Sequence, residues 1–111
     1  MAAHYQLKAG AHDQFMFNLK AANGEVILTS ELYKTKESAL NGIESVRSNS
    51  PHDEQYERKE SSSSKPYFVL KAKNHETIGR SEMYSSTAAR DNGIESVKRN
   101  GPLATLHDAT A

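Results

Sequence analysis

The chain has 111 residues, with 14 basic and 14 acidic side chains, five histidines and no cysteine. This length predicts one domain with a modest core, and the lack of cysteine excludes a disulfide framework, a thiolate zinc site and a cysteine nucleophile. The zero net charge argues against duplex DNA binding, and the absence of a signal peptide or a long apolar run predicts a cytoplasmic protein that does not bind a membrane.

The first predicted elements are three strands. Residues 4–8 predict a short opening strand. Apolar residues then alternate with polar ones over residues 15–21, and residues 25–29 are mainly β-branched and apolar; both patterns are typical of strands. Between the second and third strands, Asn23-Gly24 predicts a tight type I′ hairpin, because both residues tolerate a positive φ.

A helix is predicted after this hairpin. Thr35 suits its N-cap position, and apolar or small residues recur at helical spacing from Ala39 to Val46. Gly42 falls on this stripe, where glycine costs about 1 kcal/mol, so we expect the helix backbone to lie close to the sheet there. Pro51 prevents the helix from continuing.

A second copy of this unit follows at a shift of 51 residues. Of the 48 aligned pairs from His4 to Pro51, 20 are identical, and the run from Asn41 to Val46 returns unchanged. We therefore predict a tandem duplication within a single domain, with repeat one at 4–54 and repeat two at 55–108. The serine run at 61–64 aligns with residues inside the first copy, so it is predicted to be a loop and not a linker.

The two copies predict the fold class. Each reads β-β-β-α, and residues 104–108 match the opening strands and predict one more edge strand. We therefore expect an α+β domain in which two helices cover one face of a single antiparallel sheet. Asn74-His75 replaces Asn23-Gly24 in the second copy and predicts a looser turn. The predicted core consists of Phe17, Leu19, Ile27, Ile43 and Val46 with Phe68, Leu70, Ile78, Ile94 and Val97.

The run from Phe17 to Glu31, together with Asn41 to Val46 and its second copy, resembles the YegP-like family of small bacterial proteins. The resemblance covers nearly the whole chain and implies tandem motifs that share one sheet, with terminal strands exchanged between the copies. Single-copy relatives reach this arrangement as dimers, so we expect the duplicated chain to be a monomer. The resemblance brings no activity, catalytic residue or cofactor.

Common catalytic and metal-binding motifs are absent from the sequence. It has no G-x-S-x-G elbow, no phosphate-binding glycine loop and no H-E-x-x-H pattern. Three His-Asp pairs, at 12–13, 52–53 and 107–108, fall in loops or the tail, and none recurs in the other copy. We interpret them as surface residues and expect no enzyme activity, no cofactor and no metal.

The sheet face away from the helices is the first candidate binding surface. It is predicted to carry Lys20, Tyr67 and Lys71, and nothing in the chain is left to cover it. The favoured hypothesis is a non-enzymatic module that binds a protein partner or a ligand through this face or a sheet edge. The equivalent polar pairs to test first are Lys20/Lys71, Glu31/Glu82 and Asn41/Asn92.

Two alternatives remain open. Tyr67 and the lysines would suit single-stranded nucleic acid, which binds by stacking on aromatic rings and by charge. An enzyme is the third hypothesis. For Glu31 and Glu82, a structural role is also open, because carboxylates near a helix start offset its macrodipole.

Overall fold

The computed structural model describes residues 2–110. Repeat one contributes three strands and a helix: β1 (His4–Ala9), β2 (Phe15–Lys20), β3 (Val26–Ser30) and α1 (Lys36–Asn49). Repeat two contributes the matching elements and a final strand: β4 (Tyr56–Glu60), β5 (Pro66–Lys71), β6 (Thr77–Arg80), α2 (Thr87–Asn100) and β7 (Thr105–Asp108). One short 3-10 turn precedes β2 (Ala11–Asp13) and another precedes β4 (Asp53–Gln55).

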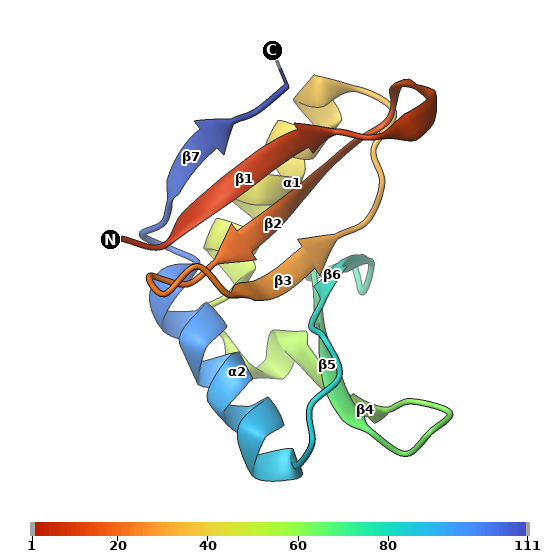
Figure 1. Ribbon diagram of the computed structural model, residues 1–111, viewed down its shortest axis with the longest axis vertical. Coiled ribbons are helices and arrows are strands. Elements are labelled where there is room, and N and C mark those ends of the chain that lie inside the picture. Colours follow the sequence, from red (N-terminus) through yellow and green to blue (C-terminus); the bar gives the residue numbers. More distant parts are fainter. Residues whose placement is uncertain (1, 111) are drawn as a thin grey trace.

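All seven strands form one sheet in the order β4-β5-β6-β3-β2-β1-β7. The central pair, β3 and β6, joins the two repeats, and α1 lies behind β1 and β2 in Figure 1. The predicted α+β class is confirmed, and so is the strand exchange, because β7 crosses from repeat two to the β1 side. The sheet departs from the prediction only at β7, which runs parallel to β1.

Two tyrosines tie each opening strand to the helix of the other repeat. Tyr5 of β1 donates a hydrogen bond to the carbonyl of Gly101 at the end of α2 (2.6 Å). Tyr56 of β4 donates to the carbonyl of Ser50 at the end of α1 (2.7 Å). Carbonyls at the end of a helix lack partners within it, so these buried hydroxyls satisfy both helix ends and lock the exchange.

The first helix begins at its predicted cap, Thr35, and the second begins at the equivalent residue, Ser86. The hydroxyls of Thr35 and Ser86 each accept a backbone N–H from three residues ahead, at 3.0 Å. At Gly42, however, the closest group is a side chain and not the sheet backbone, since an added Cβ would lie 2.7 Å from Cζ of Tyr33. Tyr84 lies against Gly93 in the same way, at 2.8 Å, so each helix needs glycine to admit a tyrosine ring.

The core contains every residue that the sequence predicted and several more. All ten predicted core residues are buried, and so are Tyr5, Leu7 and Tyr56. Leu28 is buried as well, although Ile27 beside it already faces the helices. A β-bulge explains this pair, because the register of β3 shifts between Leu19 and Lys20 and lets two consecutive residues point inward.

The hairpin turns differ from their predictions. Asn23 has no positive φ, and Gly24 alone is left-handed in this turn (φ 86°), so the type I′ prediction is wrong. Instead, Gly24 ends a three-residue loop closed by two hydrogen bonds of 2.9 Å between Ala21 and residues 24 and 25. His75 (φ 70°) takes the place of Gly24 in repeat two with the same pair of 2.9 Å bonds. The second turn is therefore not looser, and its backbone strain falls on His75.

His75→Gly is accordingly expected to stabilise the protein. A left-handed backbone costs a non-glycine residue about 1 kcal/mol, and the His75 side chain is exposed, so its loss removes little packing. We expect the free energy of unfolding, measured in urea, to rise by about 0.5–1 kcal/mol. The matched change in repeat one, Gly24→Ala, should lower it by a similar amount. A loss of stability in His75→Gly would contradict this explanation.

Candidate functional site

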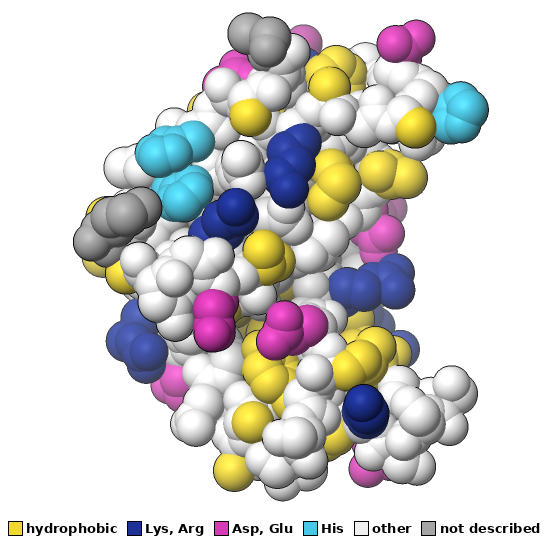
Figure 2. Space-filling model, in the orientation of Figure 1, with side chains coloured by type: hydrophobic (Ala, Val, Ile, Leu, Met, Phe, Trp, Pro, Cys, Tyr) yellow, Lys and Arg dark blue, Asp and Glu magenta, His cyan; other side chains and the backbone are white. Residues whose placement is uncertain are grey.

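The sheet face opposite the helices, here called the open face, carries an excess of cationic side chains. Strand register places five basic residues there against a single carboxylate, Glu57, among the paired strand residues. The chain as a whole balances 14 basic and 14 acidic residues, so the remainder carries the opposite surplus. Figure 2 shows dark blue and cyan side chains gathered over β1 and β2. The five basic residues are Lys8, Lys20, Lys59, Lys71 and Arg80.

Lys20, Tyr67 and Lys71 all lie on the open face, but they do not form one cluster. Lys20 and Lys71 are separated by three strand spacings and by about four residues along the strands, or roughly 20 Å. Lys71 contacts the carboxylate of Glu57 at 3.1 Å. Tyr67 lies opposite Lys59 in the register of β4 and β5, so its cationic neighbour across the strands is neither Lys20 nor Lys71.

Glu31 and Asn41 lie in a groove of about 380 Å³ between α1 and the turn that joins β5 to β6. Tyr33, Gly42, Ala72 and Ile78 are among the lining residues that are less exposed, and they form its floor. Glu31 and Asn41 contribute to its polar rim, and so does Glu76, which belongs to repeat two. The structure thus brings two predicted residues together and adds a carboxylate that the sequence analysis missed.

The electrostatic potential inside this groove is negative. Burial raises the pKa of Tyr33, and the carboxylates of Glu31 and Glu76 raise it further. The guanidinium of Arg80 lies 3.6 Å from the Glu31 carboxylate, but both side chains are well exposed, so this pair is weak.

Glu82 and Asn92 occupy the equivalent positions beside α2. Burial raises the pKa of Tyr84, and Glu82 and Glu25 add to the effect, as Glu31 and Glu76 do at Tyr33. The same set of groups therefore surrounds both tyrosines. The turns that contribute Glu25 and Glu76 lie at opposite sides of the molecule in Figure 1.

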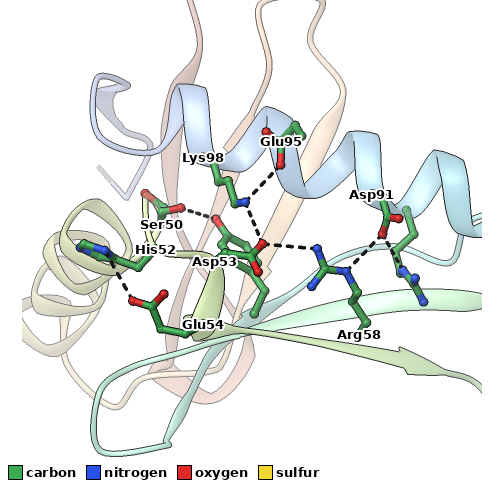
Figure 3. A network of polar contacts seen from close by, with 10 residues as sticks. Ser50, His52, Asp53, Glu54, Arg58, Asp91, Glu95 and Lys98 are labelled. Carbon is green, nitrogen blue, oxygen red and sulfur yellow. Dashed lines mark hydrogen bonds and ion pairs between the residues drawn. The ribbon is translucent and has the colours of Figure 1, made fainter.

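The His-Asp pairs lie at the surface, and one of them belongs to a network of ion pairs (Figure 3). Asp53, in the junction between the repeats, accepts hydrogen bonds from Lys98 (2.8 Å) and Arg58 (3.4 Å), and these lower the pKa of its carboxyl. Arg58 also contacts Asp91 at 3.3 Å. The network fastens the junction and β4 to α2, so its arrangement is structural.

The third pair also has a structural contact. Asp108 of β7 forms an ion pair with Lys36 of α1, and Lys36 and Thr110 hold the pKa of the Asp108 carboxyl down at about 2. Within residues 2–110, no three His, Asp or Glu side chains come close enough together to hold a metal ion. No helix in this part of the chain is long and apolar enough to cross a membrane.

Comparison with known proteins identifies the family. The model of the family described as "Domain of unknown function (DUF1508)" matches residues 4–57 and 61–108. The chain belongs to the DUF1508 family. The two matched segments fit the tandem repeat, and the resemblance to YegP-like proteins is confirmed.

Two relatives of this DUF1508 protein match over almost their full length. A UPF0339 protein of Shewanella oneidensis is 58% identical over 99% of this chain and 100% of its own. The UPF0339 protein YegP of Escherichia coli K12 is 54% identical over the same shares. The solution NMR structure of the Shewanella protein has a TM-score of 0.93 and covers 99% of this chain and 93% of that one. That of Escherichia coli YegP has a TM-score of 0.94, with 100% and 96% covered.

Glu25 and Glu76 are not predicted from the sequence, because only the folded arrangement brings each of them beside a tyrosine of the other repeat. Both flank hairpin turns, where an isolated carboxylate is usually solvated. The available signal was their identity in the two copies at an exposed position, since neither the core nor a turn requires a glutamate side chain there.

Proposed function

We propose that this DUF1508 protein is a non-enzymatic binding module that docks a negatively charged partner protein on its open face. The observation that supports this proposal is that the paired strand residues of that face include five cationic side chains and one carboxylate, in a chain of zero net charge. No ion pair involves Lys8 or Lys20 within residues 2–110, so their charges are available to a partner. Such a patch steers an oppositely charged protein and selects its orientation.

The face suits docking better than the sheet edges do. β4 presents Glu57, Arg58, Lys59 and Glu60 in succession, and β7 is only four residues long. Short, charged edge strands are typical of sheets that avoid pairing with other chains. An edge-docked partner is therefore the less favoured version of the proposal.

Loss of the open-face lysines should weaken binding of an anionic probe. The probe is a fluorescein-labelled poly-glutamate peptide, and binding is followed by anisotropy at low salt. We expect Lys8→Ala, Lys20→Ala and Lys71→Ala together to raise Kd at least tenfold, because each removes a charge from the docking face. The matched control replaces Lys34, Lys65 and Lys73, which are exposed in loops, and it should change Kd less than twofold. An equal effect of both triple variants, or no binding by the wild type, would overturn the proposal.

Single-stranded nucleic acid is the second candidate, because Tyr67 lies beside Lys59 on the same face. Aromatic stacking next to cations is the usual way of holding a single strand. In the same assay, a labelled oligothymidylate would then bind with an affinity that falls steeply with salt, and Tyr67→Ala would abolish it while leaving the peptide unaffected. Salt-insensitive or absent oligonucleotide binding would exclude this candidate.

A further inference from the structure

The groove beside α1 is a composite of the two repeats. Its helix side carries Tyr33, Asn41 and Gly42 from repeat one, while Ala72, Glu76 and Ile78 come from the β5–β6 hairpin of repeat two. The floor is largely apolar, and the rim carries two carboxylates. Its volume of about 380 Å³ is within the range of pockets that bind small organic molecules.

The duplication has kept the lining of this groove far better than the rest of the chain. Of its 11 lining positions, nine are identical in the other copy, compared with 20 of the 48 aligned pairs overall. Only Ser38 and Thr77 differ, being Ala89 and Val26 in the other copy. The nine retained pairs are Ala21/Ala72, Asn23/Asn74, Glu25/Glu76, Ile27/Ile78, Glu31/Glu82, Tyr33/Tyr84, Asn41/Asn92, Gly42/Gly93 and Ser45/Ser96.

Packing explains some of these identities but not the polar rim. Gly42 must be small because Tyr33 lies on it, and Asn74 accepts the backbone N–H of Glu76 to shape the turn (3.1 Å). By contrast, the side chains of Asn41 and Glu76 make no hydrogen bond within residues 2–110, and the same holds for Asn92 and Glu25. Contacts within the described residues therefore do not explain why these polar side chains are identical in the two copies.

From this lining we propose that the groove beside α1 binds a small organic ammonium ion, and that the equivalent residues beside α2 bind a second one. Its carbon chain would rest on the floor formed by the Tyr33 ring, Ala72 and Ile78, and its ammonium group would meet the carboxylates of Glu31 and Glu76. The amide of Asn41 would accept a further N–H. Ammonium groups are donors without acceptor capacity, which matches a rim of carboxylate and amide oxygens. Beside α2, Glu82, Glu25 and Asn92 would make the equivalent contacts.

The test is an NMR titration of ¹⁵N-labelled protein with 1,4-diaminobutane at low ionic strength. We expect saturable shifts of the amides of Asn41 and Asn74 and of their equivalents Asn92 and Asn23, with Kd in the millimolar range. Glu31→Gln with Glu76→Gln should weaken binding in the groove beside α1 at least tenfold and leave binding beside α2 unchanged. Glu82→Gln with Glu25→Gln should do the reverse. Circular dichroism verifies that both variants fold.

The control variant is Glu44→Gln with Glu95→Gln. It removes two equivalent carboxylates that lie outside the groove lining and contact Arg47 and Lys98. It should bind the diamine like the wild type. The second probe is a tripeptide with a central lysine and blocked ends. Tighter binding of this peptide would indicate that the natural ligand is a lysine side chain of a partner protein. Tighter binding of the diamine would indicate a free amine.

The absence of a saturable shift up to roughly 50 mM diamine, a concentration that would detect even weak binding, would overturn the proposal. So would equal shifts with the neutral 1,4-butanediol. An equal loss of diamine affinity in the control variant would overturn it as well. The groove does not include the lysines of the open face, so failure here leaves the proposed docking of an anionic partner untouched.

Discussion

Gly79→Ala is expected to lower the free energy of unfolding by about 2–3 kcal/mol, within the range found for overpacked cores. Gly79 lies in β6, where the two repeats meet. An added Cβ would be 2.8 Å from the carbonyl oxygen of Thr29 and 3.0 Å from Cγ of Leu28. The first of these atoms belongs to the backbone of the central strand pair, so it cannot move without disturbing the pairing of β3 with β6. Urea unfolding followed by circular dichroism measures the loss.

Gly10→Ala is the matched control. A Cβ there would meet only the carbonyl oxygen of Gln14 at 3.5 Å, an ordinary contact, and the backbone of Gly10 is extended (φ −101°). We expect a change of less than about 0.5 kcal/mol, as for a surface substitution. If both variants lost the same stability, the close approach at Gly79 would not be the cause.

The two copies have diverged where they touch each other. Gly79 is the counterpart of Leu28, and each lies against the other across the central strand pair. The ends of the helices show the same relation, because a Cβ on Gly101 would lie 2.8 Å from Cβ of its counterpart Ser50. Identical residues at either place would collide or leave a hole. A dimer of one repeat could not reproduce these pairs of large and small residues, so each repeat of this chain is fitted to the other.

Sequence periodicity was sufficient for the elements and the core, but not for features that depend on long-range register. The alternation of Phe17 and Leu19 predicts a strand and its buried face. Ile27 and Leu28 are both buried because of a β-bulge, and a strict alternation of buried and exposed residues does not predict a bulge. Similarly, the sequence places Lys20 and Lys71 on one face, yet only the strand order shows that three strand spacings separate them.

The composite groove could not be predicted from local sequence patterns, because its residues come from distant parts of the chain. Glu31 and Glu76 are 45 residues apart and come together only because α1 of one repeat lies over the hairpin of the other. Glu31 and Asn41 stand out in the sequence because they are identical in the two copies, but the sequence does not show which residues they face. Repeat identity therefore indicated two residues of the groove, and the exchanged topology adds Glu76 to them.

Raising the pH from 10 to 12 is expected to remove about 5 kcal/mol of stability, an amount comparable with the total for many small domains. Burial raises the pKa of Tyr5 and Tyr56 far above the usual value. The folded protein therefore keeps both protons, whereas the unfolded chain releases them near pH 10. Above that pH the unfolded state binds fewer protons, so stability falls as pH rises, by about 1.4 kcal/mol per pH unit for each tyrosine. Urea unfolding at pH 7, 10, 11 and 12 gives this slope.

The variant Tyr5→Phe with Tyr56→Phe separates the two roles of these hydroxyls. At pH 7 it should be less stable by about 1–3 kcal/mol per tyrosine, because the carbonyls of Gly101 and Ser50 lose their donors. Above pH 10 its stability should fall less steeply than that of the wild type, since two of the groups that titrate only after unfolding are gone. Some dependence should remain, because burial also raises the pKa of Tyr33 and Tyr84. An unchanged slope would show that other groups cause the alkaline loss. A weaker dependence of stability on pH, together with lower stability at pH 7, would show that these two hydroxyls hold the repeats together.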